Sequence, residues 1–456
     1  MLEAVAKGGE KKLFDHPRGL WVLTGTELWD RISFHGMQAL LTLYMVDYLL
    51  LPGHIERIAG FARYRAVLEA ATGHLSVQAL ASQTFGIYVG LIYFTPMLGG
   101  ALGDRLIGRR AGVIAGALLL TAGHFCMAFD VTFLLALLLL ILGAGLLRGN
   151  LAPQVATLYA QGDRRQSDAF QLFFVGINLG AFIAPIVTGT LAVAYGWHFG
   201  FGFAGMGMLV GLVIYLSGEH LLPKARRREA AVVRKRLTAE EWRRLAALCL
   251  LFAIAIGFWV AQSQVWNVYN LWVRDHVNLT FGTFTVPVPW LQALDGVAPI
   301  LVMPIFLALW RWQAGRGTEP DDLGKIAIGC LIFGAGTALL AIAPLMSGPG
   351  RASLLWPIAF HLSSNSGWLF FTPTMEALFA SRAPPGLRGT LMGANLSTVF
   401  VASVISGRLG GLYEQLSAAG FWLLHAAIVA GGGIAVLALR KPLRRLLGGS
   451  SAAEIR

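Results

Sequence analysis

Charged residues are scarce in this chain. Asp, Glu, Lys and Arg make up 13% of its 456 residues, about half the share found in soluble domains. The charges gather in short runs between apolar stretches of about 20 residues, each long enough to cross a hydrocarbon core about 30 Å thick as a helix. A chain with so little polar surface is expected to fold in lipid, as an all-α membrane protein.

Signals for metal, disulfide, nucleic-acid and enzyme chemistry are also missing. Cys126, Cys249 and Cys330 lie inside apolar stretches without metal or disulfide spacing, so we expect them to be buried apolar residues. The net charge of +12 is not interleaved with aromatic residues as in a nucleic-acid groove. No phosphate-binding loop, nucleophile elbow or metal pair is evident. We therefore expect no cofactor, no nucleic-acid partner and no enzymatic activity.

About twelve apolar spans are present, six in each half of the chain. They are expected at 20–46, 78–101, 111–129, 132–158, 168–192, 200–220, 244–268, 289–311, 324–345, 353–379, 389–412 and 419–440. Basic residues concentrate in the segments 104–110, 163–165, 223–244 and 440–445. The positive-inside rule places these segments and both termini in the cytoplasm. The first apolar run lacks a small-residue cleavage site, so it is expected to remain in the mature protein.

The chain is expected to consist of two six-helix halves, 1–220 and 244–445, with a linker at 221–243 and a tail at 446–456. The run KARRREAAVVRKRLTAEEWRR predicts a basic amphipathic helix at the cytoplasmic face. It acts either as a latch between the halves or as a charged linker that attracts anionic lipid. Halves related by an axis along the membrane normal place a substrate site between them, near the midplane.

Ionisable residues inside a membrane helix are costly and are candidates for function. The first span holds Glu27, Asp30 and Arg31, and helical spacing adds Phe34, His35 and Gln38 to the same face. A proton on either carboxylate would break its ion pair with Arg31, so the group is interpreted as a proton switch. The alternative is an interfacial charge cluster at the start of the helix.

The segment 99–110, GGALGDRLIGRR, resembles the loop between the second and third helices of major facilitator proteins. Its glycines permit a tight turn and close helix approach, and Asp104 is expected to cap the next helix or to pair with basic groups of the other half. The residues expected to form this structural and gating motif are Gly100, Gly103, Asp104, Arg105, Gly108 and Arg109.

Two further segments resemble the proton-dependent oligopeptide transporter family. The run 170–182, FQLFFVGINLGAF, resembles its fifth-helix signature, and 27–37, ELWDRISFHGM, resembles its ExxER stretch with Asp30 at the second Glu. The resemblance implies a twelve-helix major facilitator fold and proton-driven import of small peptides. The expected substrate-contact residues, from the first-span stripe and the resemblance together, are Phe34, His35, Gln38, Tyr88, Arg148, Asn178, Trp259, Ser263, Trp368 and Asn395.

Several of these positions depart from the family. Ser263 and Trp368 stand where the family has carboxylates on helices seven and ten, and the second of these faces the free amine of a peptide. Trp368 cannot neutralise an ammonium, although it offers a cation–π face. An ordinary zwitterionic dipeptide is therefore expected to bind poorly, and a modified peptide, a peptide-like natural product or an organic anion is the alternative substrate. Arg148 replaces a Lys, Gln38 an Arg and Asn395 an aromatic residue.

Asp295 is a gain, since the family usually has Asn at this position on helix eight. We interpret it as a titratable carboxylate near Ser263 that takes over proton coupling in the second half, together with Glu27, Asp30 and Arg31 in the first. The alternative is a hydrated Asp near the outer mouth. His124 and His361, in spans three and ten, are expected to be satisfied structural histidines.

The leading interpretation is a monomeric symporter that imports small peptides or peptide-like solutes with protons across the bacterial inner membrane. A second interpretation is an exporter or facilitator of a non-peptide organic solute that kept the fold but lost proton coupling. An intramembrane enzyme or receptor is a remote third. The partners expected are the substrate, protons and the lipid bilayer.

Overall fold

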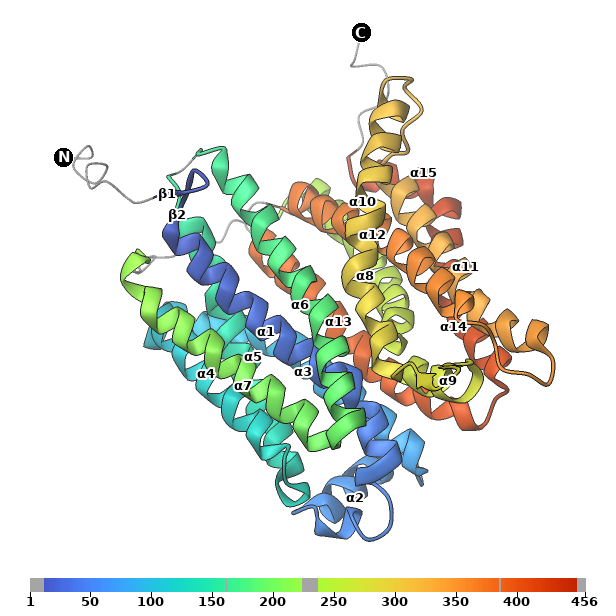
Figure 1. Cartoon of the computed structure of the whole chain (residues 1–456). Helices are drawn as coiled ribbons and strands as arrows, with labels where there is room; N and C mark the ends of the chain where they lie inside the picture. Colours follow the sequence, from blue (N-terminus) through green and yellow to red (C-terminus); the bar gives the residue numbers. More distant parts are fainter. Residues whose placement is uncertain (1–11, 161, 224–236, 385–386, 449–456) are drawn as a thin grey trace. The chain divides into compact units, whose positions relative to one another are not determined.

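The computed structural model describes residues 12–160, 162–223, 237–384 and 387–448. Long helices dominate this part of the chain (Figure 1), and two short antiparallel strand pairs are its only sheets. The chain forms two compact units, the first made of residues 1–37 and 95–228 and the second of residues 38–94 and 229–456. Each unit is described by itself below.

The first unit contains four complete long helices and the first part of α1. The helices are α1 (Arg18–Tyr44), α4 (Arg109–Cys126), α5 (Phe133–Thr157), α6 (Arg165–Tyr195) and α7 (Trp197–Gly218). α4 packs against α5 and α7, and α6 packs against α7. Glycines allow α7 to approach α1 closely, because a Cβ on Gly207 would lie 2.8 Å from the Trp29 ring and one on Gly218 would lie 2.2 Å from the Val22 side chain.

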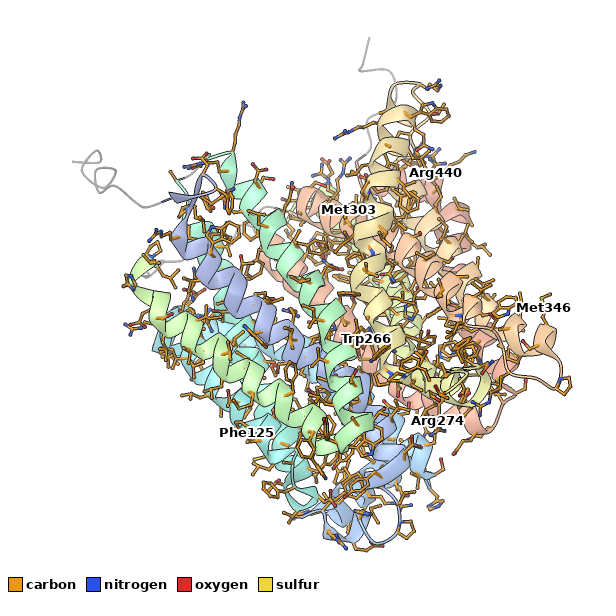
Figure 2. All side chains as sticks on the ribbon, in the orientation of Figure 1. Phe125, Trp266, Arg274, Met303, Met346 and Arg440 are labelled. Atoms are coloured by element: carbon orange, nitrogen blue, oxygen red, sulfur yellow. The ribbon has the colours of Figure 1, made fainter. Side chains whose placement is uncertain are left out.

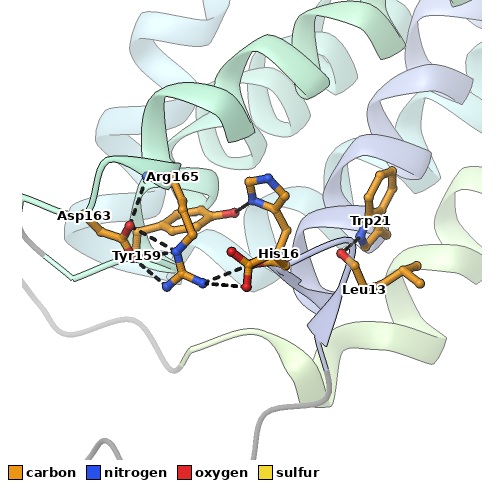
Figure 3. A network of polar contacts seen from close by, with 7 residues as sticks. Leu13, His16, Trp21, Tyr159, Asp163 and Arg165 are labelled. Atoms are coloured by element: carbon orange, nitrogen blue, oxygen red, sulfur yellow. Dashed lines mark hydrogen bonds and ion pairs between the residues drawn. The ribbon is translucent and has the colours of Figure 1, made fainter.

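A small hairpin precedes α1 and is tied to the same unit by polar contacts (Figure 3). Strands β1 (Lys12–Leu13) and β2 (His16–Pro17) are joined by Phe14 and Asp15, both at positive φ. His16 Nδ1 lies 2.8 Å from the Tyr159 hydroxyl at the end of α5. Arg165 at the start of α6 pairs with Asp163 at 2.7 Å and donates to the Asp15 carbonyl at 3.0 Å. These contacts hold the chain entering α1 against the α5–α6 connection.

The second unit contains most of the remaining helices. They are α2 (Phe61–Thr72), the first part of α3 (Val77–Leu102), α8 (Ala239–Gln264), α9 (Val268–His276), α10 (Ala293–Ala314), α11 (Asp322–Ser347), α12 (Leu355–Arg382), α13 (Arg388–Gly410), α14 (Ala418–Ala438) and α15 (Arg440–Leu446). α11 packs between α12 and α14, α8 contacts α13 and α14, and α10 contacts α12. The second hairpin, β3 (Thr280–Phe281) with β4 (Phe284–Thr285), lies between α9 and α10.

Helix starts in this unit follow local capping chemistry. Thr238 and Glu241 form a capping box at the start of α8, with each side chain bonded to the other's backbone N–H. Asp321 accepts from Gly324 N at the start of α11, and Ser417 accepts from Gly420 N at the start of α14. These caps fix where three of the expected membrane spans begin.

The predicted spans agree with the observed helices. Within the described residues, nine helices are long and apolar enough to cross a membrane, and α1, α4 and α12 lie at the positions of the three other predicted spans. Large apolar side chains point outward, such as Phe125 at 40% and Met346 at 72% exposed (Figure 2). Such exposure suits helices solvated by lipid. The sequence did not predict α2, α9 or α15, and most of the predicted linker helix lies outside the described residues. The division into six-helix halves stays a prediction.

Candidate functional site

Two acidic and two basic side chains meet in the first unit. Glu27 and Asp30 on α1 are buried, at 2% and 1% exposed. Arg31 Nε donates to Glu27 Oε1 at 2.7 Å and lies 3.6 Å from Asp30 Oδ2. Arg148 on α5 donates to both oxygens of Asp30, at 2.9 and 3.4 Å. The charges of the cluster therefore balance, because two carboxylates lie within bonding distance of two guanidinium groups.

Phe34 completes this cluster. Its ring lies one turn beyond Asp30 on α1, and the Arg148 guanidinium lies 4.1 Å from the ring centroid. A planar guanidinium stacks on an aromatic face while its edge donates to a carboxylate. The sequence assigned Arg148 and Phe34 to substrate contact and Asp30 to proton coupling, whereas the structure brings all three side chains together.

The fifth-helix signature positions α1. Gly176 and Gly180 of α6 face this helix, because a Cβ on Gly180 would lie 2.6 Å from Arg31 Cβ and one on Gly176 would lie 2.9 Å from Thr24. Asn178, between them in the chain, donates to the Phe174 carbonyl of its own helix at 2.9 Å. The glycines of the signature thus allow α6 to touch α1 directly beside the charge cluster.

The glycine-rich motif 99–110 begins in the last turn of α3 and packs on α5. A Cβ on Gly99 would lie 2.1 Å from the Gly145 carbonyl, and one on Gly103 would lie 1.8 Å from Asn150 Oδ1. Asn150 donates to the Gly99 carbonyl at 2.9 Å and so satisfies a backbone acceptor in the motif. The segment 143–150 of α5 is therefore the surface that the motif glycines contact.

The charged residues of this motif pair locally. Arg109 Nε donates to Asp104 Oδ1 at 2.7 Å, and Asp104 remains 56% exposed. Asp104 makes no side-chain cap at the start of α4, so the predicted capping role is not observed. Gly108 precedes α4 at φ +83°, a left-handed conformation that favours glycine. Gly100 lies against Gly149 of α5, and Arg105 lies in the turn 103–107 before Gly108.

In the second unit, Asp295 of α10 joins a buried polar group. Asp295 Oδ1 lies 2.7 Å from His361 Nδ1 of α12 and accepts from Asn365 Nδ2 at 2.9 Å. His361 Nε2 lies 2.9 Å from the Tyr269 hydroxyl of α9. His361 is fully buried and Asp295 is 9% exposed. The sequence placed Asp295 near Ser263, whereas the hydrogen-bonding partners of Asp295 lie on α12, and Tyr269 of α9 contacts His361.

The other candidate residues of the second unit lie outside the hydrogen-bonded group of Asp295. Ser263 Oγ lies 3.2 Å from Ser403 Oγ of α13. Gln38 and Tyr88 are buried, at 3% and 2% exposed. Trp259, Trp368 and Asn395 are partly exposed. In the first unit, His35 is also partly exposed, and its ring centroid lies 5.1 Å from that of Phe34.

Sequence reasoning missed the partners of Asp295. His361 was expected to be structural, and Tyr269 and Asn365 were not considered. These residues are 66, 26 and 70 positions from Asp295, so no local spacing connects them. The available signal was that His361 and Asp295 are isolated ionisable residues in apolar spans, and each such residue needs a partner.

The long apolar helices are those of a multi-pass membrane protein, and the solved structures that it resembles show the major facilitator fold. A crystal structure of the peptide transporter POT in complex with sulfate superposes with a TM-score of 0.84 at 24% identity, covering 96% of this chain and 98% of the other. A POT family transporter in complex with thioalcohol conjugated peptide gives a TM-score of 0.81 at 24% identity, over 95% and 98% of the two chains.

The sequence comparison narrows this class. The POT family model matches residues 110–236 and 224–423. A di-/tripeptide transporter of Lactococcus lactis subsp. cremoris is 27% identical, and the match covers 96% of this chain and 98% of the relative. The chain belongs to the POT family, as its first-span and fifth-helix motifs indicated.

Proposed function

We propose that this protein is a proton-coupled symporter that imports small peptides or peptide-like solutes. Membership of the POT family supports transport, and the relative that matches nearly the whole chain is named a di-/tripeptide transporter. The observation that carries the proposal is the buried cluster of Glu27, Asp30, Arg31 and Arg148. A group of this kind inside a membrane span is expensive, which is a reason to expect a function for it.

The cluster can exchange a proton for an anionic group. A proton bound by Glu27 removes one negative charge and breaks its ion pair with Arg31, so two guanidinium groups then face one carboxylate, that of Asp30. The excess positive charge of the cluster attracts a substrate carboxylate, because a buried charge that is not balanced is strongly destabilising. Loss of the proton restores the Glu27–Arg31 pair and expels the substrate carboxylate. Proton and substrate are thereby bound together and released together.

The substrate we propose has a carboxylate and a blocked or weakly basic amino end. Trp368 replaces the carboxylate that the family resemblance implies for the free amine, and a single indole N–H cannot neutralise an ammonium. We place Gln38, Tyr88, Asn178, Trp259, Ser263, Trp368 and Asn395 along the substrate pathway. N-blocked dipeptides are the simplest compounds with this chemistry.

We place the protein in the cytoplasmic membrane of a bacterium, as a monomer with both termini in the cytoplasm. The concentration of basic residues in the predicted cytoplasmic segments supports this orientation, and the relative from Lactococcus lactis supports a bacterial membrane. The driving force we propose is the proton gradient, without a cofactor and without catalytic turnover of the substrate.

The test is uptake of labelled dialanine and N-acetyl-dialanine into proteoliposomes under an inward proton gradient. We compare the wild type with Glu27→Gln, which removes the charge and keeps the size. Glu69→Gln is the matched control, because Glu69 also pairs with an arginine four residues away, Arg65, at 2.9 Å, but on the exposed helix α2. We expect proton-driven uptake of the acetylated compound, loss of that uptake in Glu27→Gln and wild-type uptake in the control.

Other outcomes of the uptake experiment would support a different substrate or a different transport mechanism. Rapid uptake of dialanine would contradict the argument from Trp368 while leaving the symporter intact. Movement of either compound down its own gradient, unaffected by pH and by Glu27→Gln, would identify a facilitator that has lost proton coupling. No movement of either compound would refute uptake of small peptides.

A further inference from the structure

The polar group around Asp295 differs from the cluster on α1 in its charge balance. In that cluster, the carboxylates of Glu27 and Asp30 face two guanidinium groups, Arg31 of α1 and Arg148 of α5. Asp295 instead faces the imidazole of His361 and the amide of Asn365. Within the described residues, no lysine or arginine forms an ion pair with Asp295. An ionised Asp295 beside a neutral His361 therefore carries an uncompensated negative charge in an apolar span.

Among the described residues, no other side chain in contact balances this charge, and the first turn of α10, in which Asp295 lies, offsets only part of it. From α9, the titratable group in contact is the Tyr269 hydroxyl, 2.9 Å from His361 Nε2. The charged residues further along α9, Arg274 and Asp275, pair with each other at 2.8 Å, and Arg274 also pairs with Asp47. From α12, the contacting groups are His361 itself and the uncharged Asn365. Within the described part of the unit, no lysine or arginine therefore contacts the pair.

The hydrogen bonds of Asp295 and His361 can be kept when this pair accepts one proton. In the neutral ring, Nδ1–H donates to the Asp295 carboxylate and Nε2 accepts from the Tyr269 hydroxyl. In the protonated ring, both nitrogens donate, and the phenol oxygen of Tyr269 accepts from Nε2–H while its own hydrogen turns away. Both states therefore keep both bonds, and only the net charge of the pair changes, from −1 to 0.

We propose that Asp295 and His361 bind one proton as a unit and form a second proton site of the transporter. This inference rests on the proposed function, and it extends proton binding to a histidine of α12. The proton comes from water through Asp295, which is 9% exposed, whereas the imidazole is fully buried behind it. Binding removes the uncompensated charge, and release restores it. Tyr269 is a positioning residue that holds the ring in both states.

The direct test is infrared difference spectroscopy on the purified protein in lipid vesicles at a series of pH values. The variants are Asp295→Asn, which keeps an oxygen acceptor for the His361 ring, and His361→Gln, which keeps hydrogen-bonding capacity but does not titrate. Strongly coupled groups titrate as a pair. Each variant is therefore expected to remove the partner's protonation band or shift its midpoint by at least about one pH unit.

Tyr269→Phe is a third variant that leaves both titrating groups in place. A hydrogen bond to a charged group is worth more than one to a neutral group. Loss of the phenol is therefore expected to lower the midpoint of the pair by about one pH unit. A partner band that titrates at the wild-type midpoint in both Asp295→Asn and His361→Gln would overturn the proposal.

Transport assays provide an independent readout. Asp295→Asn and His361→Gln are each expected to lower proton-driven uptake of N-acetyl-dialanine about tenfold. Counterflow needs no net proton movement and is expected to stay within about twofold of the wild type. His425→Gln is the matched control, because His425 is also fully buried in this unit but bonds to Gln264 and to the Phe421 carbonyl, with no carboxylate. A purely structural role predicts equal losses in uptake and counterflow, and similar behaviour of the two histidine variants.

The two proposals fail in different ways. If the wild type transports neither probe, the proposed function fails, and the infrared experiment alone decides whether the pair binds a proton. If the wild type shows proton-driven uptake that Asp295→Asn and His361→Gln leave unchanged, the second proton site is refuted while the symporter stands.

Discussion

The crossing of α3 and α13 in the second unit gives the most direct structural prediction. A Cβ built on Gly86 would lie 2.4 Å from the Ser403 carbonyl oxygen and 2.8 Å from Gly407 Cα. Both contacts are with backbone, which cannot turn away as a side chain does. Gln78 of α3 also donates to the Gly410 carbonyl at 3.0 Å, so the two helices are held together along this line.

The size of the effect of Gly86→Ala follows from these distances. Ordinary contact of a Cβ begins at 3.4 Å, so the helices must separate locally by about 1 Å. This separation forfeits up to about half of the dispersion energy across the contact. Overpacking of this kind costs about 1–3 kcal/mol, and the better helix propensity of alanine does not offset it, because α3 is a helix whether or not the crossing is close. A cost of about 1.5 kcal/mol lowers the population of the close crossing about tenfold.

Thiol cross-linking across the same helices measures this population. Phe94 and Phe400 have ring centroids 5.3 Å apart, and replacing both with cysteine in a background without the three native cysteines gives a suitable pair. We expect Gly86→Ala to slow cross-linking by a short bifunctional reagent about tenfold. Gly202→Ala is the control, because nothing lies within 4 Å of a Cβ there. Equal rates in Gly86→Ala and its parent would refute the reasoning.

Three further predictions concern single contacts. Gly103→Ala should lower the melting temperature in detergent by roughly 5 °C, because its Cβ would lie 1.8 Å from Asn150 Oδ1; an unchanged melting temperature would contradict this packing. Burial raises the pKa of Asp321, but hydrogen bonds from Arg440, Arg444 and Gly324 N outweigh it and lower the pKa overall. The stabilisation by Asp321 is therefore present at neutral pH and is lost as pH falls through that lowered pKa. Asp321→Asn should therefore melt about 2 °C below the wild type at pH 7 and show no difference in acid. Arg148→Lys should reduce proton-driven uptake about tenfold, because an ammonium cannot donate as a fork to a carboxylate; wild-type uptake would argue against a role for that geometry.

The positions of the membrane spans were predictable from sequence because a bilayer fixes the length of an apolar helix. The predicted span 168–192, for example, became α6 over Arg165–Tyr195. Short helices outside this constraint were not predicted. α9 spans only Val268–His276, so it is far too short to be recognised as an apolar segment that crosses a bilayer.

Part of the candidate site was also contained in the sequence. Glu27, Asp30 and Arg31 lie within one helical turn or so of each other, so their proximity follows from the helix alone. Membership of the POT family followed from the same short motifs. The assignments of individual residues to proton or to substrate remain predictions that the transport experiments test.

Tertiary structure alone decided which distant groups complete these sites. Asp30 and Arg148 are 118 positions apart, and Asp295 and His361 are 66 apart. Hydrophobic patterning specifies that each helix is buried in lipid or protein, but it does not specify which face of one helix meets which face of another. That choice depends on close packing, such as Gly180 against Arg31, and on the need of each buried ionisable group for a partner. The packing therefore determined that Asp30 pairs with a guanidinium and Asp295 with an imidazole.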